Sequence, residues 1–68
     1  MTTFAQRLRE LKEAKGVSFS QMAKGTGIGI AVLYRYTAGK TEPSLSYFAW
    51  LADYFGVSLD YLAGRDGP

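Results

Sequence analysis

Residues 19–38 read FSQMAKGTGIGIAVLYRYTA, and the spacing of apolar residues and glycines in this stretch decides the fold. Because glycine adopts the positive φ of a tight turn, the stretch predicts two short helices joined by the turn Thr26-Gly27-Ile28. Ala23 must be small if these helices cross closely. The apolar residues that must be buried to set the crossing angle are Met22, Ile28, Leu33 and Tyr36.

This spacing is typical of a helix-turn-helix motif, and capping residues and glycines outside it predict further helices. The five expected helices run from Thr3 to Gly16, from Ser18 to Gly25-Thr26-Gly27, from about Ile30 to Ala38 (with Gly29 and Gly39 as caps), from Ser44 to Gly56, and from Ser58 to Gly64. No segment alternates for long as a strand would. The expected fold class is all-α, a compact five-helix bundle with a central helix-turn-helix. Residues 1–64 are expected to form one domain, and residues 65–68 a terminal tail or the start of a linker.

Apolar residues at helical spacing define a single expected core. Its members are Phe4, Leu8, Leu11, Met22, Ala23, Ile28, Leu33, Tyr36, Leu45, Phe48, Leu51, Ala52, Phe55, Leu59 and Leu62.

Composition excludes several classes of protein. The 68 residues include no cysteine and no histidine, so the commonest general base and metal ligands are missing. We therefore expect no enzyme, no metal and no cofactor. The run Gly25-x-Gly27-x-Gly29 follows a helix rather than a strand, so no nucleotide or other small-molecule ligand is expected. No apolar run approaches the ~20 residues of a membrane span, and no secretory signal is evident, so we expect a cytoplasmic protein.

Charge is unevenly distributed along the chain. Residues 1–40 carry a net charge of +5, whereas residues 41–68 carry −3. The basic part is suited to contact phosphates, although uneven charge is also common on a solvated surface.

Residues along nearly the whole chain resemble the lambda-type repressor and Cro family, often called XRE-like. The matching segments are Leu8–Lys12, Lys15–Ser18, Met22-Ala23, Gly27-Ile28, Arg35-Tyr36, Gly39-Lys40, Pro43–Leu45, Leu51–Asp53 and Phe55–Leu62. The resemblance implies a regulator of transcription whose third helix enters the major groove of double-stranded DNA. It also implies binding as a homodimer on a palindromic operator, in the cytoplasm with the nucleoid.

The resemblance also assigns roles to residues. With Leu33 and Tyr36 inward, the residues expected to contact bases are Ile30, Ala31, Tyr34 and Arg35. Those expected to contact phosphates are Phe19, Ser20, Gly29, Ala38, Lys40, Thr41 and Ser44, with main-chain N–H groups at the starts of the second and fourth helices, including that of Leu45. Lys12 is expected to face Thr37.

Two alternatives follow from apolar surfaces. Ile30 and Ala31 offer no hydrogen bonds to bases and can contact only thymine methyls, so the patch that they form with Val32 and Tyr34 could instead bind a protein. In that case the chain is a protein-interaction module that keeps the fold.

A second aromatic face is expected on the fourth and fifth helices. Tyr47, Trp50 and Tyr54 recur at helical spacing, and Tyr61 adds to them. This face is either a dimer interface or half-buried against the bundle's own loops.

Overall fold

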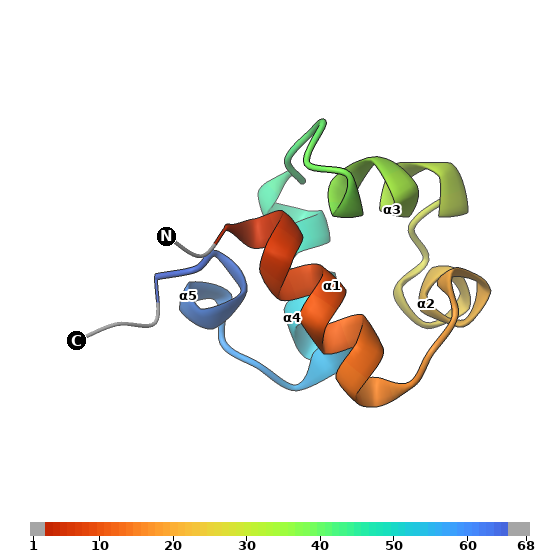
Figure 1. Cartoon of the computed structure of the whole chain (residues 1–68), viewed down its shortest axis with the longest axis horizontal. Helices are drawn as coiled ribbons and strands as arrows, with labels where there is room; N and C mark the ends of the chain where they lie inside the picture. Colours follow the sequence, from red (N-terminus) through yellow and green to blue (C-terminus); the bar gives the residue numbers. More distant parts are fainter. Residues whose placement is uncertain (1–2, 66–68) are drawn as a thin grey trace.

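Five helices make up the computed structural model, which describes residues 3–65 and contains no strand within that range (Figure 1). They are α1 (Phe4–Lys15), α2 (Phe19–Thr26), α3 (Ile30–Thr37), α4 (Leu45–Phe55) and α5 (Leu59–Leu62). The expected all-α fold is confirmed. Of the expected tail, Arg65 donates its main-chain N–H to the Asp60 carbonyl at 2.8 Å, and residues 66–68 lie outside the described residues.

Four helices begin at a hydroxyl side chain, as the sequence predicts. Thr3, Ser18, Ser44 and Ser58 each accept a hydrogen bond from the main-chain N–H three residues later. At Ser18 the capping box is complete, because the Gln21 side chain accepts the Ser18 N–H at 2.8 Å. These bonds satisfy N–H groups that the first turn of a helix leaves without partners.

The turn between α2 and α3 lies one residue later than expected. Helix α2 continues through Gly25 to Thr26, and the turn is Gly27-Ile28-Gly29. Thr26 is buried, and its hydroxyl donates to the Met22 carbonyl at 2.7 Å and accepts the Ile28 N–H at 3.2 Å. This side chain therefore belongs to the last turn of the helix, and Gly27, with φ of 78°, is the residue that ends it.

One core joins all five helices. Helix α1 packs against α3 and α5, and α2 packs against α3 and α4 (Figure 1). The buried cluster consists of Phe4, Leu8, Met22, Ile28, Leu33, Tyr36, Leu51, Ala52 and Leu62, all predicted from the sequence. Leu11, Ala23, Phe48 and Phe55 are partly buried around it.

The prediction that Leu45 and Leu59 belong to the core is wrong. Leu45 is 77% exposed and Leu59 is 43% exposed. Leu45 lies on the same helical face as the buried Ala52 but two turns earlier, at the first residue of α4, where that face is exposed. Leu59 likewise begins α5, a single turn whose inward position is taken by Leu62.

Helix α2 lies close to Tyr54 of α4 at Gly25. A Cβ atom on Gly25 would lie 2.2 Å from Cε1 of Tyr54 on α4. Ala23 is only partly buried against the core. Among the described helices, none has both the length and the apolar character needed to cross a membrane.

Candidate nucleic-acid interface

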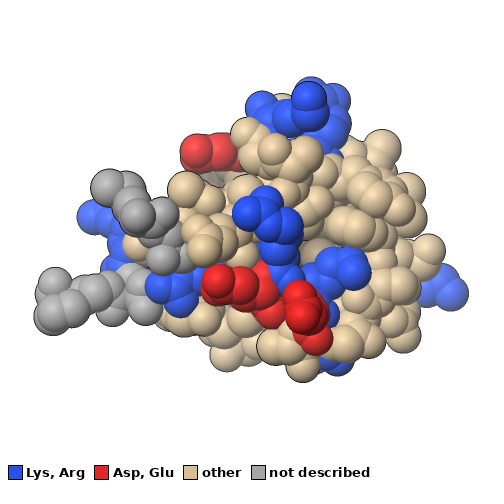
Figure 2. Space-filling view, in the orientation of Figure 1, with Lys and Arg blue, Asp and Glu red and all other residues tan. Residues whose placement is uncertain are grey.

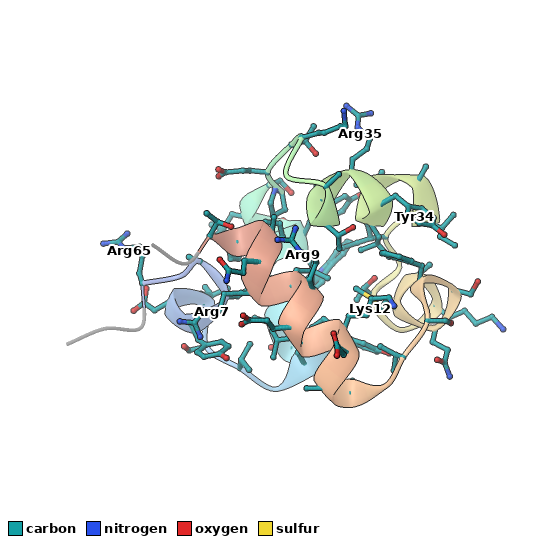
Figure 3. The ribbon with its side chains drawn as sticks, in the orientation of Figure 1. Arg7, Arg9, Lys12, Tyr34, Arg35 and Arg65 are labelled. Atoms are coloured by element: carbon teal, nitrogen blue, oxygen red, sulfur yellow. The ribbon has the colours of Figure 1, made fainter. Side chains whose placement is uncertain are left out.

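Helix α3 exposes the side that the sequence predicts. Leu33 and Tyr36 are buried, whereas Ile30 and Tyr34 are 41% and 54% exposed. Ala31, Arg35 and Ala38 are exposed as well. Figure 3 shows Arg35 pointing away from the bundle, whereas Tyr34 lies on the side of α3 toward α2. Val32 is the exception, because it packs partly buried against the core and does not extend the apolar patch.

A hydrogen bond from α1 holds the end of α3. The guanidinium of Arg9 donates through Nη1 to the main-chain carbonyl of Thr37. The Thr37 hydroxyl donates to the Tyr34 carbonyl at 3.0 Å. A cation near the C-terminus of a helix is favourable, since the last carbonyls lack intrahelical partners. Arg9 thereby ties α3 to α1.

Lys12, which was expected to face Thr37, contacts the ring of Phe19. Lys12 lies one turn after Arg9 on α1, and its Nζ sits 4.7 Å from the centre of the Phe19 ring. The Phe19 ring in turn stacks on Tyr34, with ring centres 4.1 Å apart and planes inclined by 32°. The three side chains link α1, the start of α2 and the exposed face of α3.

The starts of α2 and α4 retain main-chain N–H groups suited to an anion. The Ser18 and Ser44 hydroxyls accept the N–H groups of Gln21 and Tyr47, the third residue of each helix. The N–H groups of the first two residues, Phe19 and Ser20 in α2, have no acceptor within their helix. Ser20 and Ser44 are exposed, and Phe19 is partly buried.

Cationic side chains accompany α3. Arg35 and Lys40 are exposed, as is Gly29 at the start of the helix, and Thr41 is partly exposed. Figure 2 shows Lys and Arg along the upper edge of the molecule, above α3 and the loop after it, whereas most Asp and Glu visible on this face lie lower, over α1. Lys40, the one charged residue among the predicted phosphate contacts, therefore lies with Arg35 beside the exposed face of α3.

The aromatic residues of α4 and α5 differ in their surroundings. Trp50 is 46% exposed and stacks on Tyr47 at 5.1 Å. Tyr54 packs over Gly25, and the Nζ of Lys15 lies 5.1 Å from its ring centre.

Tyr61 is covered by α1. The guanidinium carbon of Arg7 lies 4.0 Å from the centre of the Tyr61 ring. Of the four aromatic residues predicted to form a dimer interface, Tyr54 and Tyr61 are thus engaged within the bundle, and Trp50 is the most accessible.

The sequence did not predict the hydrogen bond from Arg9 to Thr37, the stacking of Phe19 on Tyr34, or the cations that lie over aromatic rings. No local pattern links residue 9 to residue 37, or residue 7 to residue 61, because these contacts depend on how the helices cross. Within residues 3–65, no three His, Cys, Asp or Glu side chains gather as a metal site would require.

Comparison with known proteins agrees with this geometry. Residues 3–64 match the family model described as a helix-turn-helix domain. The chain is 37% identical, over 59 residues, to the SPbeta prophage-derived uncharacterized HTH-type transcriptional regulator YonR of Bacillus subtilis. That alignment covers 87% of this chain and 55% of the relative, so the chain spans little more than half the relative's length. The similarity to a transcriptional regulator agrees with the expectation that the chain is not an enzyme.

Solved structures share the fold. The restriction-modification controller protein C.AhdI of Aeromonas hydrophila superposes with a TM-score of 0.81 at 32% identity, covering 87% of this chain and 89% of that one. The P22 c2 repressor, solved with a synthetic operator, has a TM-score of 0.90 at 20% identity, covering 97% of this chain and 100% of that one. At 20% identity, the similarity to the P22 c2 repressor supports the fold alone. On the match over residues 3–64, this chain belongs to the helix-turn-helix domain family, in its lambda repressor and Cro, or XRE-like, branch.

Proposed function

We propose that this chain is the DNA-binding domain of a transcriptional regulator that places α3 in the major groove of double-stranded DNA. The observation that carries the proposal is the exposed face of α3, bordered by Arg35 and Lys40, in a chain of the helix-turn-helix family. The prophage-derived relative and the restriction-modification controller support a regulator of a mobile element. Such a protein works in the cytoplasm on the nucleoid and represses by blocking access of polymerase.

Contacts are divided between bases and phosphates. Arg35 is the polar candidate for a base contact, since its guanidinium can donate to the two acceptors of guanine. Tyr34 lies next to Arg35 on the face of α3 that enters the major groove of the DNA. The proposed phosphate contacts come from the first residues of α2 and α4, from both ends of α3 and from the loop after it: Phe19, Ser20, Ser44, Gly29, Ala38, Lys40 and Thr41.

Binding at varied salt concentrations tests the proposal. Sites selected from a random DNA pool are labelled, and affinity is measured by fluorescence anisotropy. Affinity should fall linearly on a log–log plot, with a slope set by the number of phosphates neutralised. Lys40→Ala should reduce that slope by about 1, whereas Arg35→Ala should cost about 1–3 kcal/mol and relax specificity at one base pair.

Arg65→Ala is the matched control. Figure 3 places Arg65 at the end of the molecule opposite Tyr34, so this variant should leave affinity and slope nearly unchanged. Equal losses in the Arg35 and Arg65 variants would contradict a contact role for Arg35. Failure to recover any site from the pool would favour the alternative, a protein-interaction module.

The proposed regulator acts as a homodimer, with Trp50 at the contact. Its exposed ring, stacked on Tyr47, supports this choice among the aromatic residues of the predicted interface. Sedimentation at high micromolar concentration should detect a dimer that Trp50→Ala weakens. A strict monomer in both forms would contradict it.

A further inference from the structure

A hollow lies where the end of α1 meets the start of α2 and the end of α3. Its volume is about 440 Å³, and its walls come from one side of α1, from the turn after it, and from Phe19 and Thr37. Small-molecule sites in proteins typically occupy about 300–1,000 Å³, so this hollow is large enough for a small metabolite. The sequence predicts no small-molecule ligand, because only the crossing of three helices brings these residues together.

Three charged side chains of α1 line this hollow. Arg9 precedes Lys12 by three residues and Glu13 by four, so all three lie on one side of the helix. Figure 3 shows Lys12 on the side of α1 toward α2. Within residues 3–65, none of the three forms an ion pair. Two positive charges and one negative charge are therefore available to a ligand.

The remaining wall of the hollow is apolar. Val17 and Phe19 line it and are partly buried against the core. Gly16 also lines it, and a Cβ atom added there would meet no atom within 4 Å, so the space beside the turn is open. This wall can cover a hydrocarbon group of a ligand whose charged groups face α1.

We propose that this hollow is an effector site for a free amino acid with an apolar side chain. Such a molecule carries one carboxylate, one ammonium group and one hydrocarbon group, which match the charges and the apolar wall. The carboxylate binds at Arg9 and Lys12, and the ammonium group binds at Glu13. The hydrocarbon group lies on Val17 and Phe19.

The residues that line the hollow also hold α3. Arg9 donates a hydrogen bond to the Thr37 carbonyl, and Phe19 stacks on Tyr34. The Nζ of Lys12 lies 4.7 Å from the Phe19 ring centre. A bound carboxylate competes with the Thr37 carbonyl and the Phe19 ring for these cations. Occupation of the hollow therefore loosens α3 and lowers the affinity for DNA, a role that rests on the proposed function.

Leucine and its two truncated analogues test the site. L-leucine, titrated into the isotope-labelled chain, should shift the main-chain N–H signals of Val17 and Phe19 in NMR spectra. Isocaproate, which lacks the ammonium group, and isoamylamine, which lacks the carboxylate, should each bind about fivefold more weakly, as expected for one exposed ion pair.

Variants assign each charged group of the ligand to its partner. Glu13→Gln should weaken leucine binding about fivefold and leave isocaproate binding unchanged, because isocaproate has no ammonium group to lose. Lys12→Gln should weaken leucine and leave isoamylamine unchanged. Glu10→Gln is the matched control: this glutamate is exposed on α1 but does not line the hollow, so leucine should bind as in the parent.

Each failure has a distinct meaning. No shifts at millimolar leucine, equal affinity for leucine and both analogues, or equal losses in the Glu10 and Glu13 variants would overturn the site and leave the proposed function standing. Saturating leucine should lower the affinity for selected DNA about fivefold in fluorescence anisotropy. Leucine that binds without this loss would overturn the effector role. Absence of DNA binding altogether would overturn the proposed function itself.

Discussion

Replacing Gly25 by alanine should destabilise the fold when the Tyr54 ring is present and stabilise it when that ring is removed. In the parent, the new Cβ would lie 2.2, 2.6 and 3.2 Å from Cε1, Cδ1 and Cζ of the tyrosine ring. Ordinary contact begins at 3.4 Å, so the ring must retreat by about 1.2 Å at Cε1. The retreat disturbs its contact with the Phe55 ring, 5.0 Å away, and with the Nζ of Lys15.

Opposing terms set the magnitude. Overpacking costs about 1–3 kcal/mol, and a displaced cation–π contact adds about 0.5 kcal/mol. Alanine in a helix interior recovers about 1 kcal/mol relative to glycine. Gly25→Ala should therefore destabilise the parent by about 1–2 kcal/mol, which lowers the melting temperature by roughly 4–16 °C in a chain of this size. In a Tyr54→Ala background the clash is absent, and the same change should stabilise by up to about 1 kcal/mol.

Urea denaturation of the four proteins of this double-mutant cycle, followed by circular dichroism at 222 nm, measures both effects. The expected coupling between the two sites is about 1–3 kcal/mol. Gly27→Ala is a useful comparison: its φ is +78° and no atom lies within 4 Å of the added carbon. Its cost of about 1–2 kcal/mol comes from backbone strain and should be the same in both backgrounds. If Gly25→Ala stabilised the parent, or acted equally in both backgrounds, the steric argument would be refuted.

Three further predictions concern the core. Thr26→Val should lower the free energy of unfolding by about 1–3 kcal/mol, because it leaves the buried Ile28 N–H without its acceptor. Thr26→Ser keeps the hydroxyl and should keep the stability. A valine variant as stable as the parent in urea would argue against this role of Thr26. Leu62→Ala should cost about 2–5 kcal/mol and Leu59→Ala about 1 kcal/mol or less, since only the former is fully buried; equal melting temperatures would contradict the placement of α5. Burial, and to a smaller extent Tyr47, raises the pKa of Tyr36 above its usual 10.0. Ionisation is therefore easier in the unfolded chain, so stability present below pH 10 should be lost as pH rises through the folded pKa; the loss should be smaller in Tyr36→Phe, and an equal loss in both proteins would count against this residue.

The local elements were predictable because their signals lie within a few residues of one another. A serine and the N–H three positions later form a cap whatever surrounds them, as Ser18 and Ser58 illustrate. Gly27 and Gly56 end helices because they adopt a left-handed backbone conformation. The outward side of α3 followed from the buried Leu33 and the helical step of 100° per residue. Fold class, helix order and the exposed residues of the candidate interface were thus all available from the amino-acid sequence.

Side-chain partners between helices were decided by the tertiary structure alone. Arg9 meets the carbonyl of Thr37 and Arg7 covers Tyr61, across 28 and 54 positions of sequence. Helical periodicity placed Leu45 on the same face as the buried Ala52, but the lengths and crossing of the helices leave this end of the face exposed. A helix carries its caps and its apolar face in its own residues, but which side chains touch across a crossing depends on the angle and offset at which several such faces pack together.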